Sequence, residues 1–268
     1  MEQNNLIHPE DASSRQDNSR REFIFKAATG VLLTTGALTI PFQRLHIEGK
    51  IKAVAFDGFA VFDPRPVFAL TEKLFPGKGK EIAETWRVKQ FEYSWLRQSA
   101  NQYRNFLDIT ADALVFAARK AQVNLSEGDK TLLVNAWLSL ELWPDVLPTL
   151  ELLKKKGLRM GFLSNMTRPM LDSCIQHNKL DEYFNIVLST DQLKTYKPSP
   201  RSYQMGPDAF DLKKSEILFI AFASWDAAGA KWFGYPTYWV NRMDVTPEEL
   251  HASADKSGKT LDGIRNLV

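Results

Sequence analysis

The sequence predicts an α/β protein: a doubly wound, mainly parallel sheet with a helical cap inserted after its first strand. From residue 146 onward, short apolar, β-prone runs alternate with helical patterns, as parallel strands joined by right-handed crossovers require. An isolated β-prone run at 51–56 is instead followed by helix after helix up to residue 142. This helical block is best explained as an insertion into the parent domain.

The predicted elements follow from their apolar spacing and their turn residues. Helices are expected at 67–75, 81–98, 106–122, 129–142, 146–155, 170–179, 201–210 and 229–233. Strands are expected at 51–56, 159–163, 184–188, 217–220 and 236–240, with a loop at 252–260. We therefore divide the chain into a leader (1–45), a core domain (46–63 and 144–268) and a helical cap (64–143).

Composition limits the class of protein. The 268 residues are 44% apolar and 25% charged, as in a globular domain that buries a full core. A net charge of +2 gives no sign of nucleic-acid binding. The single cysteine, Cys174, precludes an internal disulfide, and four scattered histidines form no metal-ligand pattern. We expect neither a metal nor another cofactor.

The N-terminus carries a pattern typical of an address. Arg20 and Arg21 precede a weakly apolar stretch at 27–40, which is shorter than the roughly 20 residues of a membrane span. This resembles a twin-arginine export signal, read by export machinery and not used as an anchor. A basic amphipathic leader helix is the alternative. The prediction is a periplasmic or otherwise exported protein, with the cytoplasm as the alternative location.

Polar side chains recur where predicted strands end: Asp57, Ser164 with Asn165, Lys197 and Asp226. Since open α/β sheets bind ligands at the carboxyl ends of their strands, we expect these groups to meet at one edge. Each alone has a simpler explanation, because Asn165 and Asp226 suit helix caps and Lys197 suits a solvated loop. Their recurrence in one topology favours a site for a small-molecule substrate.

These stretches resemble the haloacid dehalogenase superfamily, and within it the L-2-haloacid dehalogenase type. The resemblance covers residues 50–243. It rests on Phe56-Asp57 with Phe62-Asp63, Trp95-Leu96-Arg97, Leu163-Ser164-Asn165, Tyr196-Lys197-Pro198-Ser199-Pro200-Arg201 with Tyr203, and Trp225-Asp226 through Ala230 with Phe233-Gly234-Tyr235-Pro236-Thr237.

The resemblance implies a role for each catalytic residue. Asp57 would attack the halogen-bearing carbon and form an ester that water hydrolyses. Lys197 would pair with that carboxylate, and Arg97 would assist the departing halide. Asp226 would orient Lys197 or position the water.

The substrate pocket is implied in the same way. Ser164 and Asn165 would bind the substrate carboxylate, while Phe59, Tyr203 and Trp225 would line the pocket. The resemblance also implies a homodimer.

Phosphatases of the superfamily carry a second aspartate two residues after the nucleophile, as an acid for the leaving alcohol. Here that position is Phe59. Halide needs no proton to leave, so the replacement suits dehalogenation better than phosphate ester hydrolysis. Mg²⁺ is compatible with this pattern, since it binds through one or two carboxylates together with a substrate phosphate.

The chain departs from the family pattern at two motifs. The first is one residue shorter and has Ala60 and Val61 where the family has glycine and threonine. Ahead of Asp226, Ala223 stands at an asparagine position, with Ser224 as a candidate substitute. Three hypotheses remain: a hydrolase of carbon–halogen bonds, a hydrolase of another substrate such as a phosphate ester, and a binding protein without turnover.

Overall fold

The computed structural model describes residues 50–268. The predicted leader with Arg20 and Arg21 lies outside the described residues. In the part of the chain that is described, no helix has the length and apolar character needed to cross a membrane.

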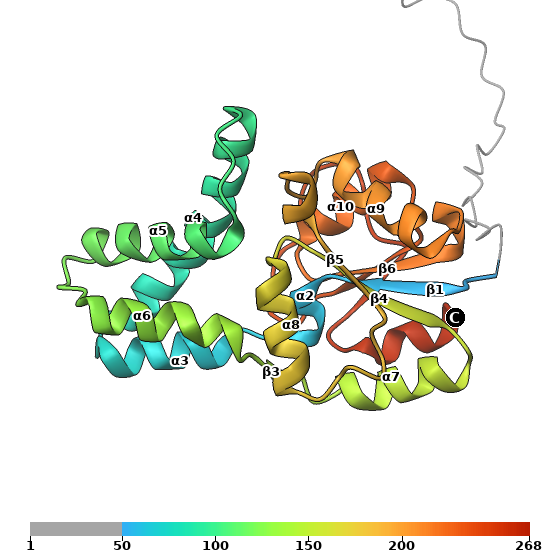
Figure 1. Ribbon diagram of the computed structural model, residues 1–268, viewed down its shortest axis with the longest axis horizontal. Coiled ribbons are helices and arrows are strands. Elements are labelled where there is room, and N and C mark those ends of the chain that lie inside the picture. Colours follow the sequence, from blue (N-terminus) through green and yellow to red (C-terminus); the bar gives the residue numbers. More distant parts are fainter. Residues whose placement is uncertain (1–49) are drawn as a thin grey trace, which may run out of the picture. The chain divides into compact units, whose positions relative to one another are not determined.

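Six strands form one sheet in the order β5-β4-β1-β6-β7-β8 (Figure 1). All neighbouring pairs in it are parallel, which confirms the predicted doubly wound sheet. The central strand β1 places Ala55 between Gly161 and Phe219. The strands are β1 (Ala53–Phe56), β4 (Arg159–Ser164), β5 (Ile186–Ser189), β6 (Ile217–Ala221), β7 (Thr237–Val240) and β8 (Lys256–Gly258).

Helices cover both faces of this sheet because successive strand residues point to opposite sides. In β1, Val54 and Phe56 join the core under α7 (Val146–Lys155) and α8 (Arg168–His177). Ala53 and Ala55 join a second core, which packs against α9 (Pro200–Phe210) and α10 (Ser224–Phe233). A strand buried on both faces explains the unbroken apolar run that predicted it.

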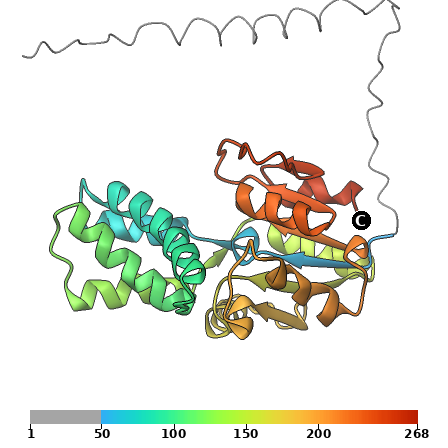
Figure 2. The ribbon, with the colours of Figure 1, turned by 90° about the horizontal axis from the view of Figure 1, so that it is seen from above.

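The helical block forms a group of its own beside the sheet (Figures 1 and 2). It comprises α3 (Arg65–Leu74), α4 (Gly79–Ser99), α5 (Phe106–Lys120) and α6 (Glu127–Asn135). Asn105 and Ser126 cap the amino ends of α5 and α6 with their side chains. This is the arrangement expected of an inserted cap, although its exact boundaries remain a prediction.

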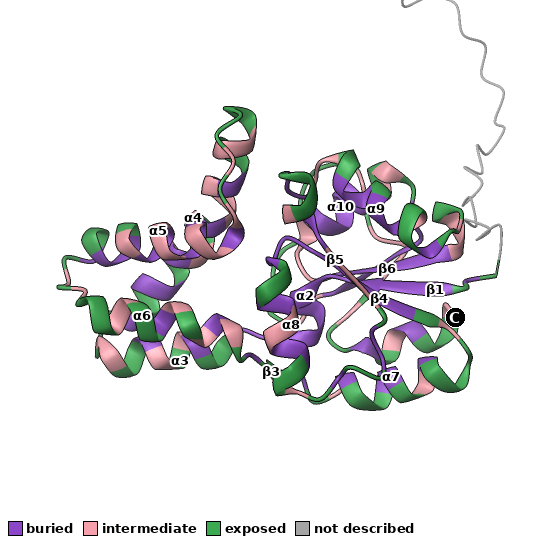
Figure 3. Ribbon diagram, viewed as in Figure 1, coloured by how far each residue is buried: buried purple, intermediate pink, exposed green. Residues whose placement is uncertain are grey.

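The four helices of the cap bury their apolar faces toward one another (Figure 3). Trp86 of α4 is fully buried, and its Nε1 donates to the carbonyl oxygen of Thr110 in α5 at 2.7 Å. The Gln90 amide donates to the Thr110 hydroxyl at 2.9 Å. These buried polar contacts fix how α4 turns about its own axis, and therefore which side chains it directs at the core domain.

Two short strands link the cap to the core domain. The chain leaves through α2 (Gly58–Val61) and β2 (Phe62–Asp63), and returns through β3 (Glu141–Leu142), which pairs antiparallel with β2. The helix predicted over 129–142 is therefore wrong in its second half. It ends at Asn135, a 3₁₀ turn follows at Ala136–Leu138, and pairing with β2 overrides the local helical pattern.

Candidate active site

The predicted strand-end residues meet at the carboxyl edge of the sheet. Asp57 follows β1, Asn165 follows β4, Lys197 follows β5 and a 3₁₀ turn, and Asp226 lies in the first turn of α10 after β6. The strands β5, β4, β1 and β6 are consecutive in the sheet. Their tips therefore bring residues 140 positions apart into contact, as the Lys197–Asp57 hydrogen bond demonstrates.

A buried ammonium group joins two carboxylates at the centre of this edge. Lys197 Nζ lies 2.7 Å from Asp57 Oδ1 and 2.7 Å from Asp226 Oδ2. The side chains of Lys197 and Asp226 are each 1% exposed and that of Asp57 is 10% exposed. The second oxygen of Asp57 accepts from the amide of Phe59 at 3.0 Å. Asp57 is thus the member of the group that solvent and a small molecule can reach.

Asp226 is held on both oxygens. Burial raises its pKa from 3.8 to about 6, and Lys197 opposes that shift by attraction. Lys197 keeps its proton, since the two carboxylates outweigh its own burial and raise its pKa. The Tyr203 hydroxyl donates to Asp226 Oδ1 at 2.7 Å. Asp226, which Tyr203 fixes by its hydrogen bond, therefore holds the ammonium group of Lys197 in place.

Tyr203 does not line the pocket, contrary to the prediction. It is fully buried in the second core, beside Phe219 and Tyr235. Burial and the Asp226 charge raise its pKa well above 10. Its position follows from α9, whose apolar face packs on the sheet and turns the ring toward the base of α10.

Asn165 has an unused donor in a buried position. Its Oδ1 accepts from the Lys197 amide at 2.9 Å and from the Thr190 hydroxyl at 3.1 Å. Its Nδ2 has no partner within residues 50–268, although it is buried. Ser164 is also buried, and its hydroxyl oxygen accepts from the Met166 amide at 3.2 Å. Buried donors rarely stay unpaired, so this edge is suited to receive an acceptor such as a carboxylate.

The cap contributes Arg87, which the sequence analysis did not select. Its guanidinium carbon lies 4.2 Å from the ring centroid of Phe59 and 4.4 Å from that of Phe91. Burial lowers its pKa to about 10, while the charge of Asp57 acts in the opposite direction. Arg87 therefore remains positively charged at neutral pH, near the nucleophile candidate, and its Nη1 donates to Gln90 Oε1 at 3.1 Å.

Arg97, by contrast, is not brought to Asp57. It lies in the last turn of α4, donates to the Gln102 carbonyl oxygen at 3.4 Å and pairs with Asp112 at 3.7 Å. Arg97 lies ten residues after Arg87, which is about 15 Å along a helix. The two guanidinium groups therefore cannot both contact the substrate at the same point. The sequence carried a signal for Arg87, because it precedes Phe91 by four residues and shares its helix face.

Aromatic side chains form the walls next to Arg87. Phe59 is buried and packs edge-on against Trp137. Trp225 is partly buried, with its ring centroid 5.1 Å from Phe91 and 5.2 Å from Trp95. Phe59 and Trp225 thus each contact an aromatic or guanidinium group of the cap, Phe59 at Arg87 and Trp225 at Phe91, and their role as the pocket lining stays a prediction.

Helix α4 also contacts the loop that carries Lys197. The indole nitrogen of Trp95 donates to the Lys197 carbonyl oxygen at 3.1 Å. Gln98 Oε1 accepts from the Thr195 hydroxyl and from the Tyr196 amide. The same helix therefore positions Arg87 and steadies the main chain around Lys197.

The residues that depart from the family pattern supply no polar group in place of the expected ones. Val61 is fully buried, and Ala223 lies at the start of α10 without a side-chain cap. The Ser224 hydroxyl donates to Glu248 at 3.0 Å, so Ser224 does not take over the missing polar group. Within the described residues, no three His, Cys, Asp or Glu side chains converge as metal ligands.

Fold and site together define an α/β protein with a carboxylate nucleophile candidate at the carboxyl edge of its sheet. Residues 88–240 match the family profile described as haloacid dehalogenase-like hydrolase. The chain belongs to the haloacid dehalogenase-like hydrolase family, and within it is homologous to L-2-haloacid dehalogenases.

The relatives and solved structures agree. The chain is 39% identical to the (S)-2-haloacid dehalogenase of Pseudomonas sp. (strain YL), over 81% of this chain and 94% of the relative. It is 35% identical to haloacetate dehalogenase H-2 of Moraxella sp. (strain B), over 82% and 98%. The structure of L-2-haloacid dehalogenase from Xanthobacter autotrophicus with covalently bound chloropropionic acid superposes with a TM-score of 0.75, at 28% identity over 81% and 98%.

Replacing the buried lysine tests the electrostatics of the site. Lys197→Met leaves two buried carboxylates without a cation, which costs about 3–5 kcal/mol of unfolding free energy. Asp226 already has a raised pKa of about 6, and losing the cation raises it further. The folded variant then binds more protons than the unfolded chain above pH 4, so its unfolding free energy is higher at pH 5 than at pH 7.

Urea denaturation of Lys197→Met at both pH values measures this. Lys259→Met is the control, because Lys259 is 67% exposed in its pair with Asp244 and changes stability by less than about 0.5 kcal/mol. Equal unfolding free energies of Lys197→Met and the unmodified chain at pH 7 would contradict the role of Lys197 as the cation that compensates the two buried carboxylates.

Proposed function

We propose that this protein releases halide from short 2-haloalkanoic acids by hydrolysis, through an ester on Asp57. The observation that carries the proposal is the environment of that carboxylate. One of its oxygens is bound to the buried Lys197 and the other to a backbone amide, while Arg87 supplies a second positive charge from the cap. The covalent chloropropionate complex of a relative supports the same chemistry.

In the first step, an oxygen of Asp57 forms a bond to C2 of the substrate as the carbon–halogen bond breaks. The halide leaves with the bonding electron pair. Arg87 is placed to donate to that developing anion, because its charge lies near Asp57 within an aromatic enclosure where electrostatic attraction is weakly screened. Arg87 thus takes the role first expected for Arg97.

The substrate carboxylate is held apart from the leaving group. The free Nδ2 of Asn165 and the hydroxyl of Ser164 are buried donors at the strand tip next to Asp57. Binding the carboxylate there satisfies the unpaired amide and turns C2 toward Asp57. Phe59 and Trp225 exclude water from the halogen.

In the second step, water adds to the carbonyl carbon of the Asp57 ester. The ester bond breaks and releases a 2-hydroxy acid, one proton is released, and Asp57 returns as a carboxylate. Asp226 is the second carboxylate bound to Lys197, but Lys197 and Tyr203 occupy both its oxygens. Its role is thus to position Lys197 more than to take a proton from water.

Phosphate ester hydrolysis is less well supported. A leaving alkoxide needs a proton, and the residue two positions after Asp57 is Phe59, whose ring lies against Arg87. Halide leaves without a proton. The apolar ring is therefore compatible with carbon–halogen cleavage and unsuited to an acid's role.

A second candidate is slow turnover with retention of the ester. It is favoured by Ala223, which offers no polar group, and by Ser224, whose hydroxyl is bound to Glu248. Such a protein would be alkylated at Asp57, and hydrolysis of the ester would release the product slowly. Intact mass measurement after mixing with 2-chloropropionate distinguishes the two, since only slow hydrolysis leaves the adduct on most of the protein.

We also propose that Arg20 and Arg21 direct export through the twin-arginine route to the periplasm. What supports this is the arginine pair ahead of the weakly apolar stretch at 27–40. The homodimer implied by the family resemblance likewise stays a prediction.

Loss of the nucleophile should abolish the reaction. Asp57→Asn keeps the size of the side chain but weakens the attacking oxygen, so halide release from 2-chloropropionate should fall by about 10³-fold or more. An ion-selective electrode measures the release, and circular dichroism checks the fold. Undiminished release by Asp57→Asn would remove this residue from the mechanism.

EDTA should leave the activity of the unmodified protein unchanged.

The two arginines of α4 give a direct comparison. Arg87→Gln removes the positive charge near Asp57, and kcat should fall about 10²- to 10³-fold. Arg97→Gln changes a partly exposed ion pair with Asp112, and kcat should stay within about twofold. Both variants are assayed for halide release alongside the unmodified protein. The reverse order of effects would restore the role first expected for Arg97.

The export proposal is tested in cells. Arg20→Lys/Arg21→Lys should hold the full chain in the cytoplasm, as judged by immunoblotting of periplasmic and cytoplasmic fractions. A variant with a lysine change outside the pair, Arg15→Lys, is the control and should be exported normally. Unaltered export of the double variant refutes the assignment.

A further inference from the structure

Two side chains bind the carbonyl groups of the main chain that follows Asp57. Trp143 Nε1 donates to the carbonyl oxygens of Phe59 and Phe62, at 3.0 and 3.2 Å. Arg242 donates to the carbonyl oxygen of Ala60 from Nη2 at 2.9 Å and from Nε at 3.3 Å. The Trp143 amide donates to Val61 at 3.2 Å. Every carbonyl oxygen from residue 59 to residue 62 is therefore bound.

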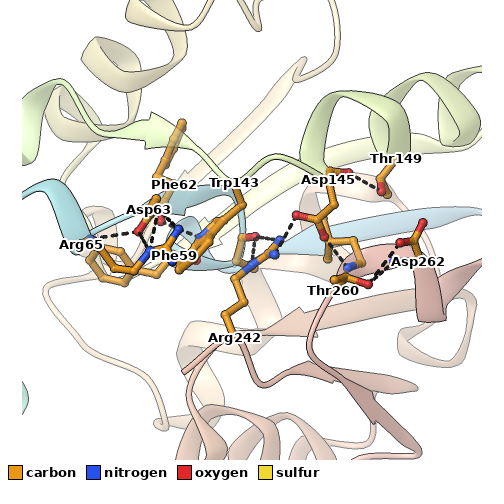
Figure 4. Close-up of polar contacts among 12 residues, drawn as sticks. Phe59, Phe62, Asp63, Arg65, Trp143, Asp145, Thr149, Arg242, Thr260 and Asp262 are labelled. Atoms are coloured by element: carbon orange, nitrogen blue, oxygen red, sulfur yellow. Dashed lines mark hydrogen bonds and ion pairs between the residues drawn. The ribbon is translucent and has the colours of Figure 1, made fainter. Parts of the chain in front are cut away.

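These two side chains come from distant parts of the chain. Trp143 lies where the chain returns from the cap, directly after β3, and Arg242 follows β7 (Figure 4). Arg242 Nη1 also lies 2.7 Å from Asp145 Oδ1, and Asp145 Oδ2 accepts from the Leu261 amide at 2.6 Å. The two carboxylate oxygens of Asp145 thus tie Arg242 to the C-terminal segment.

Packing fixes the same group further. The guanidinium carbon of Arg242 lies 4.7 Å from the Trp143 ring centroid, and that of Arg65 lies 4.4 Å from it. The Arg242 side chain is 3% exposed and that of Asp145 is 15% exposed. A buried arginine bound to both a carboxylate and a main-chain carbonyl oxygen has little freedom to move, so the Ala60 carbonyl group that it binds is held in place.

The amide side of this turn bears on the carboxylate itself. The Phe59 amide donates to Asp57 Oδ2 at 3.0 Å, and the Ala60 amide donates to the Asp57 carbonyl oxygen at 3.1 Å. Each peptide plane carries a carbonyl group on one side and an amide on the next residue. The Phe59 carbonyl group shares its peptide plane with the Ala60 amide, so tilting that plane would displace the donor to the Asp57 carbonyl oxygen and, through the Cα of Phe59, the amide that binds Asp57 Oδ2.

We propose that Arg242 and Trp143 are positioning residues that set the attack geometry of Asp57 through the carbonyl groups of residues 59–62. They touch neither the substrate nor the reacting atoms. The pair couples the return strand of the cap to the orientation of the nucleophile. This inference rests on the proposed dehalogenase function, but its structural part does not need turnover.

Arg242→Lys is the main test. Lysine keeps a positive charge for Asp145 but cannot bridge Asp145 and Ala60 with a planar fork. A misplacement of reacting groups by 1 Å costs on the order of 10²-fold in rate, so kcat for halide release should fall 10- to 100-fold while KM changes less than about threefold. Arg265→Lys is the matched control, since Arg265 is 52% exposed in its pair with Asp262, and it should leave both constants unchanged.

Amide hydrogen exchange of the full chain, followed by mass spectrometry, gives a readout without substrate. Arg242→Lys should exchange faster across residues 57–63 and remain as protected as the unmodified chain in β4 and β6. If Arg242→Lys does not fold, Trp143→Phe replaces it, because phenylalanine keeps a ring and removes the donor to Phe59 and Phe62. It should give the same local loss of protection.

The two proposals fail in different ways. Absence of halide release by the unmodified chain refutes the dehalogenase function, and the exchange experiment still decides the positioning role. Unchanged exchange at 57–63 overturns the positioning role, and so does a change in KM with constant kcat. Faster exchange at 57–63 together with reduced kcat supports it.

Discussion

The contact of Lys197 with Asp57 and Asp226 is the interaction on which the rest of the site depends. An ammonium group with 1% exposure is far from water, and its burial is tolerable only with two carboxylates at 2.7 Å. The pair of carboxylates leaves an excess of negative charge, which Arg87 balances from the cap. The four groups are then formally neutral. Formation of the halide then leaves the net charge of the enclosure unchanged, because Asp57 loses its negative charge in the ester as the halide gains one, while the substrate carboxylate meets the buried donors of Asn165 and Ser164.

Much of this arrangement was predictable from the sequence because parallel strands end at one edge. Asp57, Asn165, Lys197 and Asp226 follow consecutive strands of the sheet, so a one-dimensional pattern of strand followed by polar residue translates directly into proximity. The burial of both faces of β1 explains why an unbroken apolar run predicted it. These inferences required only the order of the elements and no knowledge of side-chain direction.

The errors concern features that depend on direction or on pairing. Arg87 and Arg97 lie on one helix, and only the rotation of α4 set by Trp86 and Gln90 decides which one approaches Asp57. Tyr203 was expected in the pocket, but the face of α9 that packs on the sheet turns it behind Asp226. The strands β2, β3 and β8 are two or three residues long. Their partners define them, and no propensity in so short a segment could have indicated them.

The contacts of α4 with the loop before α9 give the cap a second importance. Trp95 donates to the carbonyl oxygen of the residue that bears the central ammonium, and Gln98 binds the two residues before it. Arg87 is part of the same rigid rod. A displacement of this helix away from the core domain would withdraw one cation from the carboxylate and release the support of the other in a single movement. Asp57 would then keep Lys197 as a positive neighbour but lose Arg87. Its reactivity therefore depends on the contact between α4 and the core domain.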